Sequence, residues 1–328
     1  MTYKTRRRRS DLRITAVGVD FKRRAKGKPM TDQANAPMGP SGKEILVTGA
    51  TGTIGREVVD QLLADRQKVA AVTRNPATVK LPAGVHLVGG DPSHPETLVS
   101  ALSGVDAIFL VPRAVGSATA ELLSLAAQHG VQRVVSLSAV TVEFPAGNQR
   151  FAEEFKAVED AVKASGLQWT LLRCADFDAN ARAWAPQIRS NGVVRGAYGS
   201  AATSPIHERD IAAVAVRALL SAAYAGRTFV LTGPESLSQR AKVQLLGKAI
   251  GKDLSWEEIS PEQVRQAMVS QGLPKDVPER LLGSLADYAK QPGPSSTNVQ
   301  ELLGRSSLTF AKWAAEHADS FRNPEGRP

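Results

Sequence analysis

The sequence has only one cysteine and no long apolar run. Because Cys174 is alone among 328 residues, no disulfide can form within the chain. This cysteine usage fits a reducing compartment, and we expect a cytoplasmic protein in which Cys174 is a small buried apolar residue rather than a reactive thiol. No stretch of 18 apolar residues occurs, so we predict neither a transmembrane helix nor a membrane partner.

Two kinds of catalytic site are also missing. No group of His, Cys, Asp and Glu residues has the spacing of metal ligands, so no metal is predicted. No Gly-x-Ser-x-Gly stretch occurs, which excludes the nucleophile elbow of the α/β-hydrolases.

Acidic residues are scarce only at the start of the chain. Residues 1–43 hold 12 Lys and Arg against three Asp, while the remaining residues hold 29 charges of each sign. The formal net charge of +9 therefore belongs to the first 43 residues. We expect no nucleic acid to bind the rest of the chain, because its charges cancel.

The basic segment over residues 1–43 is expected to be a disordered tail, because it sustains no apolar periodicity. Arg6–Arg9 and Lys22–Arg24 could make it an arm that binds polyanions without specificity. Alternatively, the native protein starts at Met30 or Met38, and the upstream residues are not part of it. We favour this second interpretation.

A glycine-rich turn follows the first apolar run after the tail. Ile45–Val47 is typical of a buried strand, and the apolar spacing from Ile54 onwards is helical. Between them, Gly49 permits a tight turn, Gly52 lets the backbone approach a pyrophosphate, and Gly55 lets the helix pack close to the strand. The free N–H groups at the helix start would hold the phosphates. We predict a dinucleotide site here, in preference to a strand–helix turn that binds nothing.

Strands and helices alternate from this turn to about residue 173. Further strands are predicted over 69–73, 85–88, 107–111, 134–137 and 169–172, with helices over 95–102, 118–129 and 151–164. This alternation predicts an α/β fold with a doubly wound parallel Rossmann sheet.

The pattern loosens in the second half of the chain. We predict helices over 179–188, 210–222, 239–250, 261–271, 277–288 and 309–317, a strand over 228–232, and a loop over 191–204. The expected organisation is a Rossmann domain over residues 44–175 and a smaller, mixed, mainly helical lobe on the substrate side over residues 176–322. Some of its elements return to the Rossmann core. Residues 323–328 should fray.

The residue that follows the second predicted strand bears on the choice between NAD(H) and NADP(H). An NAD-binding unit usually places Asp or Glu about 20 residues past the glycines, to hold the adenine ribose. Here Arg74 stands at that place, and a guanidinium can hold a 2′-phosphate, which favours NADP(H) over NAD(H). The alternative for Arg74 is an ordinary surface residue. Asp91, after the third strand, could accept a hydrogen bond from the adenine amino group or cap the next turn.

Together these segments resemble the NmrA-like family of atypical short-chain dehydrogenases/reductases, which have an NAD(P)-binding Rossmann fold. The segments that carry the resemblance are 48–55, 73–76, 90–91, 135–138, 165–173, 210–214 and 231–234, with Phe177 and Asn180. It covers about residues 44–321, and it is specific to the family but not to a reaction. Its members include quinone reductases, isoflavone-reductase-like enzymes and redox-sensing regulators that bind the cofactor without turning it over.

The resemblance implies a set of cofactor-binding residues: Gly49, Thr51, Gly52, Thr53, Ile54, Gly55, Arg74, Asp91, Val111, Pro112 and Ser138. The first six would line the pyrophosphate. Arg74 and Asp91 would meet the adenosine end, and the remaining three the nicotinamide end.

The Tyr-x-x-x-Lys dyad of typical short-chain dehydrogenases is absent. Lys156 lies on the helix after the fifth strand, but the residue four positions earlier is Ala152, and the four tyrosines lie elsewhere. This absence argues against a conventional carbonyl reductase or sugar epimerase. Lys156, Ser138 and His207 are weak catalytic candidates, and each has an ordinary structural interpretation as well.

Three aromatic residues, Phe155, Phe177 and Trp184, are predicted to line the substrate pocket, although each could equally serve the core. Many NmrA-like sequences have His four residues before a Glu that matches Glu159. Here Phe155 occupies the position of that His, and it would make the pocket more apolar.

Two functions are consistent with these features. The first is an NAD(P)H-dependent oxidoreductase, with NADPH preferred, that transfers a hydride to a quinone-like, aromatic or enone small molecule. The second is a non-catalytic NADP(H)-binding redox sensor that acts through a protein partner. We expect a monomer or a homodimer.

Overall fold

The computed structural model describes residues 44–322. The predictions for the basic tail over 1–43 and for residues 323–328 lie outside the described residues and stay predictions. None of the described helices is long and apolar enough to cross a membrane.

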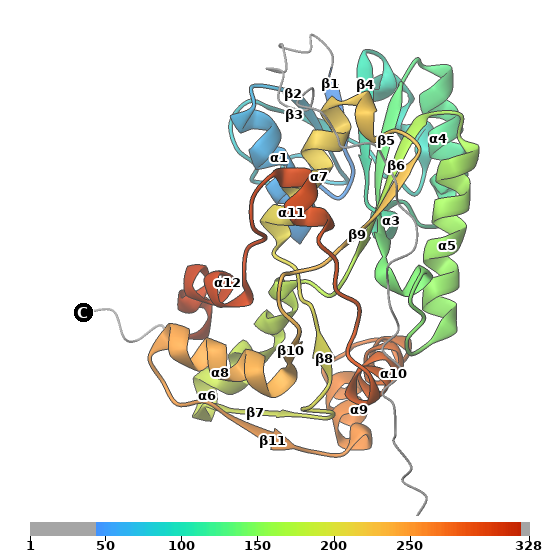
Figure 1. Ribbon diagram of the computed structural model, residues 1–328. Helices are drawn as coiled ribbons and strands as arrows, with labels where there is room; N and C mark the ends of the chain where they lie inside the picture. The colour runs from blue at the N-terminus through green and yellow to red at the C-terminus, as the bar shows by residue number, and fades with distance from the viewer. Residues whose placement is uncertain (1–43, 323–328) are drawn as a thin grey trace, which may run out of the picture. The chain divides into compact units, whose positions relative to one another are not determined.

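A seven-stranded parallel sheet forms the centre of the fold (Figure 1). Its strands are β1 (Glu44–Val47), β2 (Lys68–Thr73), β3 (Val85–Gly89), β4 (Val105–Leu110), β5 (Arg133–Ala139), β6 (Gln168–Cys174) and β9 (Arg227–Leu231). Their order is β3-β2-β1-β4-β5-β6-β9, and every neighbouring pair is parallel. The predicted doubly wound α/β sheet is confirmed. The order reverses beside β1, and such a switch point is where open α/β sheets bind their ligands.

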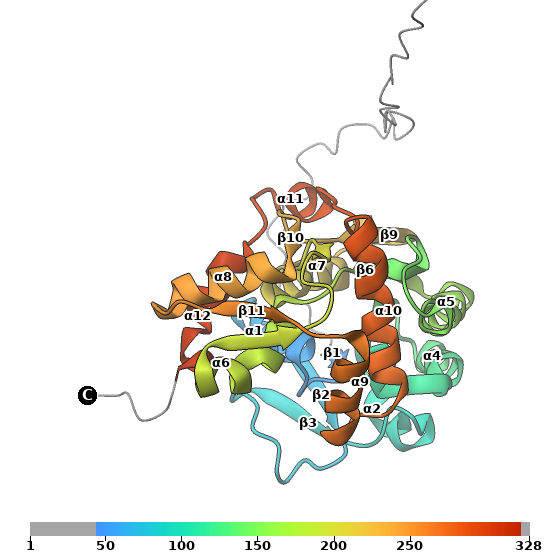
Figure 2. The same cartoon turned by 90° about the horizontal axis from the view of Figure 1, so that it is seen from below.

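Helices cover both faces of the sheet. α1 (Thr53–Ala64) and α7 (Glu208–Leu220) lie on one face, and α4 (Thr119–Gln128) and α5 (Gln149–Ala164) lie on the other (Figures 1 and 2). Two short helices, α2 (Val99–Leu102) and α3 (Pro112–Val115), follow β3 and β4. Because both faces are covered, the central strands are apolar and almost fully buried, as in β4 and β5.

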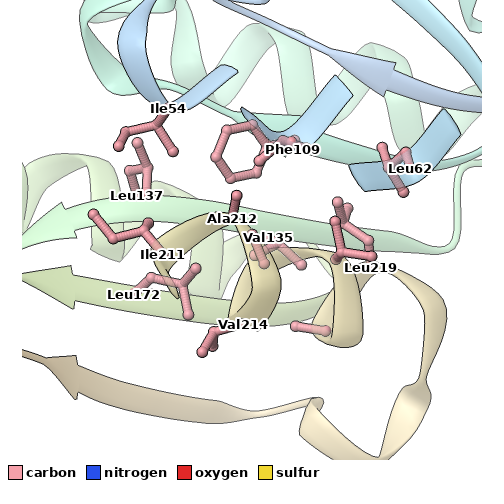
Figure 3. Packing of buried hydrophobic residues seen from close by; sticks show 14 of the residues in the cluster. Ile54, Leu62, Phe109, Val135, Leu137, Leu172, Ile211, Ala212, Val214 and Leu219 are labelled. Carbon is pink, nitrogen blue, oxygen red and sulfur yellow. The ribbon is translucent and has the colours of Figure 1, made fainter. Parts of the chain in front are cut away.

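The second half of the chain returns to this sheet through β9 and α7. Figure 3 shows Ile211, Ala212 and Leu219 of α7 packed against residues of β4, β5 and β6. All three are buried, and each large apolar side chain removed from water stabilises the fold by about 1.5–3 kcal/mol. α11 (Asn298–Leu303) adds to the same cluster. The division into two domains after residue 175 stays a prediction.

The remaining elements lie below the sheet in Figure 1 or beside it. They are α6 (Ala185–Asn191), β7 (Val193–Gly196), β8 (Ala202–Thr203), β10 (Leu237–Ser238), α8 (Gln239–Ile250), β11 (Ser255–Glu258), α9 (Pro261–Ser270), α10 (Asp276–Lys290) and α12 (Phe310–Glu316). β8 pairs with β10 in antiparallel fashion, and β7 pairs with β11 in parallel. Apart from the apolar clusters on the two faces of the sheet, a third apolar cluster, which includes Val194, Leu246 and Trp313, joins these elements.

Several local predictions were wrong. The segment 191–204, predicted as a loop, contains β7 and β8, and the strand β11 and the helix α11 were not predicted. The strands β7 and β8 are only four and two residues long, and each is stabilised by a partner strand that follows much later in the chain. The predicted helix over 179–188 begins instead as a 3-10 segment over Asp178–Trp184.

Candidate functional site

The glycine-rich turn joins β1 to α1 and leaves the helix start open. Gly49 has a φ of +61°, a conformation that favours glycine, and the N–H of Gly52 donates to its carbonyl at 2.9 Å. A Cβ at Gly55 would lie 2.1 Å from the Gly49 carbonyl oxygen, so only glycine lets α1 start this close to the turn. Gly52, as the N-cap, offers no side chain to the first N–H groups of the helix.

A buried hydroxyl connects this turn to the next strand of the sheet. Thr48 Oγ1 donates to the carbonyl of Phe109 at 3.0 Å and accepts the N–H of Val111 at 2.8 Å. The bond holds the end of β4 beside the turn, and Gly49 lies directly against the Val111 side chain. Pro112, the next residue, is buried and begins α3. Sequence reasoning did not single out Thr48, since its role depends on a partner 61 residues away.

The residues of the turn fit the pyrophosphate of a dinucleotide. Thr51, Gly52 and Thr53 are exposed at the uncapped start of a twelve-residue helix, where backbone N–H groups and the helix dipole favour an anion. Ile54 differs from its neighbours, because its side chain belongs to the buried cluster in Figure 3. Only its backbone can therefore face a cofactor.

Arg74 and Asp91 follow β2 and β3 at the same edge of the sheet. Arg74 is exposed and has no hydrogen bond or ion pair within residues 44–322 that would hold it elsewhere. The carboxylate of Asp91 accepts from the Ser93 N–H at 3.0 Å and from the Ser93 hydroxyl at 2.7 Å. These bonds, with the weaker effect of nearby positive charges, hold the pKa of Asp91 below its ordinary value. The turn-capping role weighed for Asp91 is thus present in the structure.

At the end of β5, Ser138 belongs to a buried charged network. Its hydroxyl donates to Glu159 of α5 at 2.8 Å, and Arg173 of β6 donates to both Glu159 oxygens at 2.7 Å. The third guanidinium nitrogen of Arg173, Nη1, donates to Glu143 at 2.8 Å. The Glu159 side chain is 1% exposed. Burial alone would raise the pKa of Glu159, but the hydrogen bonds from Arg173 and Ser138 outweigh it and lower the pKa.

The three catalytic candidates therefore lie in different surroundings. The Ser138 hydroxyl proton is committed to Glu159, so its free lone pairs are what it can offer to a ligand. Lys156 is exposed on α5 and pairs with Asp160 at 2.7 Å. His207 is fully buried at the start of α7, where its Nδ1 accepts the N–H of Arg209 and its Nε2 lies 3.2 Å from a Glu316 oxygen. The structure does not bring these three residues together.

The three aromatic pocket candidates are also separate. Phe155 packs edge-on against Phe151, with ring centroids 4.9 Å apart. Phe177 packs against the sheet cluster, and Trp184 packs edge-on against Trp256 in the third apolar cluster. Phe177 and Trp184 thus show the core packing that was the alternative for each of them.

A buried acid that sequence reasoning missed lies just past the end of β6. Asp178 is 1% exposed, and neither of its carboxylate oxygens has a hydrogen-bond partner within residues 44–322. Burial, followed by the negative charges of Asp176 and Glu208, raises the pKa of Asp178 to about 8. The positive charge of Lys242, whose amine pairs with Asp176 at 3.3 Å, lowers the pKa of Asp178 but does not outweigh these effects. Asp178 therefore carries a proton at neutral pH. In the sequence, this buried acid could have been suspected from two aspartates, Asp176 and Asp178, that closely follow a predicted buried strand.

Cys174, the last residue of β6, is buried, and burial raises the pKa of its thiol. Within the described residues, no group of three or more His, Cys, Asp and Glu side chains could hold a metal ion.

A family model described as NAD(P)H-binding matches residues 49–222, which is more than half of the chain. The chain belongs to this NAD(P)H-binding family. It is 38% identical over 281 residues to a (4-alkanoyl-5-oxo-2,5-dihydrofuran-3-yl)methyl phosphate reductase from Streptomyces griseus, a match that covers 84% of this chain and 99% of the relative. It is 34% identical to an NAD(P)H azoreductase from Xenophilus azovorans, with 84% and 99% of the two chains covered.

Among solved structures, the chain resembles the Escherichia coli NADPH-dependent quinone oxidoreductase QOR2 in complex with NADPH. The TM-score is 0.72 at 26% identity, and the match covers 83% of this chain and 99% of that structure. The resemblance to NmrA-like reductases is thereby confirmed at the level of the family. The comparisons support an enzyme, an NAD(P)H-dependent oxidoreductase, rather than a non-catalytic sensor.

Replacing Glu159 with Ala should lower the free energy of unfolding by about 3–5 kcal/mol, because the Arg173 guanidinium would keep its partly buried position without its main partner. The measurement is denaturant unfolding at neutral pH. Lys156→Ala, on the solvent side of the same helix, should cost less than about 1 kcal/mol. Equal losses in the two variants would contradict this account of the network.

Asp178 should make stability depend on pH. The folded chain keeps a proton on Asp178 up to about pH 8, whereas the unfolded chain releases it near 3.8, so this carboxyl lowers stability as the pH rises between these values. In Asp178→Asn that contribution disappears. The stability of the variant relative to wild type should therefore increase by up to about 1.4 kcal/mol per pH unit between pH 5 and 8.

The matched control for this measurement is Asp319→Asn, a side chain that is 81% exposed. Its stability relative to wild type should stay constant over the same range. A constant difference for the Asp178 variant as well would show that Asp178 does not hold the proton.

Proposed function

We propose that the chain is an NADPH-dependent reductase that transfers a hydride to a flat, conjugated small molecule such as a quinone or an enone. The observation that carries this proposal is the uncapped start of α1 behind the Gly49–Gly55 turn, which fits a dinucleotide phosphate. The relatives named as reductases of quinone, azo and butenolide phosphate substrates support the acceptor class.

In this proposal the chain binds and orients the reactants. The N–H groups of Thr51 and Thr53 hold the pyrophosphate, and the Thr48 hydroxyl keeps Val111 and Pro112 beside it at the nicotinamide end. Arg173 and Glu159 fix the Ser138 hydroxyl so that its lone pairs face the same end. When bound in its reduced form, the cofactor supplies a hydride to the acceptor, and a proton completes the reduction.

A conjugated acceptor suits a site without a tyrosine acid. The negative charge that arises on a quinone or enone after hydride addition is delocalised, so water can provide the proton. Lys156 is not placed to do so, since it is exposed and paired with Asp160. The apolar rings of Phe151 and Phe155 on α5 are suited to a flat substrate.

The preference for NADPH over NADH is part of the same proposal. Arg74 is exposed at the end of β2, where NAD-binding units usually place an acid, and its guanidinium can hold the 2′-phosphate. Asp91 would meet the adenine with Oδ2, the oxygen that does not bond Ser93 and that lies 3.7 Å from His94 Nδ1. We keep two further proposals on sequence grounds alone: a cytoplasmic location, and a monomer or homodimer that does not bind nucleic acid through residues 44–322.

Turnover tests the reaction. Oxidation of NADPH by the full chain should be measurable with several quinones and cyclic enones, and it should be much slower with simple aldehydes and ketones, which need an acid to protonate the developing alkoxide. The measurement is the loss of NADPH absorbance over a panel of acceptors. Tight binding of NADPH without turnover of any acceptor would overturn the proposed reaction.

Binding tests the cofactor preference. Arg74→Ala should raise the Kd for NADPH by roughly 10- to 100-fold, the value of one or two charge-assisted hydrogen bonds, and should leave the Kd for NADH nearly unchanged. Lys80→Ala, which removes another exposed cation between β2 and β3, is the control and should change neither. Equal affinities of the wild type for NADPH and NADH would contradict the proposed preference for NADPH.

A further inference from the structure

The last turns of α10 pack against the loop that leaves the end of β5, beside the start of α5 (Figure 1). Asp287 accepts the N–H of Gly147 at 2.9 Å, and the Ser284 hydroxyl donates to the carbonyl of Ala146 at 3.3 Å. Gly147 has a φ of +70°, and a Cβ there would overlap the Ser284 nitrogen. The helix therefore lies backbone against backbone on this loop, a contact that only glycine permits.

The same loop is tied to the proposed nicotinamide end of the site. Glu143, at the start of the loop, accepts from Arg173 at 2.8 Å. The same guanidinium holds Glu159, which accepts from the Ser138 hydroxyl. Hydrogen bonds on both sides of the loop thus fix α10 relative to Ser138.

Tyr288 extends this contact from β5 to the neighbouring strand β6. Its ring lies against Gly293, where a Cβ would come 3.2 Å from a ring carbon. The N–H of Gly293 donates to the carbonyl of Ala202 at 2.9 Å. Thr203, the next residue, donates to Asp176, which lies just past β6, at 3.1 Å. The end of α10 therefore spans the carboxyl ends of β5 and β6, at the edge where α/β sheets bind their ligands.

The Tyr288 hydroxyl has no partner in the described part of the chain. The residue is half-buried, but its hydroxyl is not among the unpaired polar atoms that the fold seals from solvent, so a ligand can reach it. Burial, followed by the negative charge of Asp176, raises the pKa of Tyr288 to about 12. The hydroxyl therefore keeps its proton at neutral pH and is available as a hydrogen-bond donor.

The side of α10 that carries Tyr288 is apolar and only partly covered. Leu281, Leu285 and Tyr288 follow one another at spacings of four and three residues, so they share one side of the helix. Leu281 is 42% exposed, and Leu285 is half-buried. An apolar wall with one hydroxyl suits a flat conjugated ligand that carries an oxygen acceptor.

We propose that the Tyr288 hydroxyl donates a hydrogen bond to the carbonyl oxygen of the acceptor, while Leu281 and Leu285 contact its apolar part. This inference rests on the proposed reductase function and names a residue that binds its substrate. In the reduction, a C–H bond forms on the acceptor as NADPH is oxidised, and a π-electron pair moves onto the oxygen, which becomes negative.

The hydrogen bond from Tyr288 strengthens during this step. A hydrogen bond to a charged oxygen is stronger than one to a neutral carbonyl, so Tyr288 stabilises the transition state more than the bound substrate. A hydroquinone is itself a phenol of ordinary acidity, and a tyrosine with a raised pKa does not give up its proton to the corresponding anion. Tyr288 thus acts as a donor of a hydrogen bond, and water protonates the product.

Removing the hydroxyl tests the contact. Tyr288→Phe keeps the ring and should lower kcat/KM for a naphthoquinone and for a cyclic enone by roughly 10- to 100-fold, the value of one hydrogen bond to a charged oxygen. The Kd for NADPH should change less than about threefold, because the contact is made to the acceptor. Tyr224→Phe, before β9 at the opposite edge of the sheet, is the control and should change neither value. An unchanged kcat/KM in Tyr288→Phe, or an equal loss of NADPH affinity, would overturn the inference.

Removing the bond between Asp287 and Gly147 tests how α10 positions the hydroxyl. Asp287→Ala should lower kcat/KM for the naphthoquinone by roughly 3- to 10-fold, whereas Asp287→Asn keeps an oxygen for the Gly147 N–H and should stay within about twofold of wild type. Glu279→Ala, an exposed acid on the same helix, is the control and should leave kcat/KM unchanged. In the Tyr288→Phe background, Asp287→Ala should cause no further loss, because it acts through the hydroxyl. A full further loss would contradict this positioning role.

A binding measurement separates this inference from the proposed reaction. The planar anion 4-nitrophenolate resembles the oxyanion that hydride addition forms, and in titration calorimetry the NADP⁺-saturated wild type should bind it at least about tenfold more tightly than Tyr288→Phe does. Turnover of quinones that Tyr288→Phe leaves unchanged would reject the inference and leave the reductase function standing. Phenolate binding that depends on Tyr288, without turnover of any acceptor, would reject the reductase function and leave the oxygen-binding residue standing. Equal phenolate binding without turnover would reject both.

Discussion

The close approach of α1 to the preceding turn is the constraint on which the proposed site depends. The helix begins against the Gly49 carbonyl, and a single Cβ at Gly55 would occupy the space that this contact requires. No side chain within the described residues caps the first N–H groups of α1. The Thr48 hydroxyl extends the same geometry to the end of β4, so one short turn positions both the residues proposed for the pyrophosphate and those proposed for the nicotinamide end.

The charged groups near the site divide into those that are satisfied and those that are not. Glu159 is fully engaged by Ser138, Arg173 and Lys163, which suits a rigid support rather than a group that exchanges protons. Asp178, in contrast, has no hydrogen-bond partner among the described residues for either carboxylate oxygen, and its burial raises its pKa to about 8. Unsatisfied groups of this kind are more informative about ligands than the satisfied ones are.

Sequence reasoning located the parts of the site that depend on neighbours in the chain. The strand–turn–helix around Gly49–Gly55, the alternation of strands and helices, and the lack of a tyrosine four residues before Lys156 are all visible in short windows. It did not find β7 and β8, which depend on partners at 255–258 and 237–238. It also considered His207 and Lys156 as catalysts without knowing that one caps α7 and the other faces solvent.

The sequence by itself determined the fold class and the position of the dinucleotide turn, because apolar periodicity and glycine spacing act over a few residues and specify local backbone geometry. It also excluded a disulfide within the chain, because there is one cysteine, and a Tyr-x-x-x-Lys dyad, because Ala152 stands four residues before Lys156 and the tyrosines lie elsewhere. Only the tertiary structure decided which side chains act together. Ser138 meets Glu159 across 21 positions of the chain, and Arg280 meets Phe151 across a much longer separation, because helices and strands distant in sequence pack side by side. No local pattern encodes such a contact, since it arises from burial of the whole sheet between its helices.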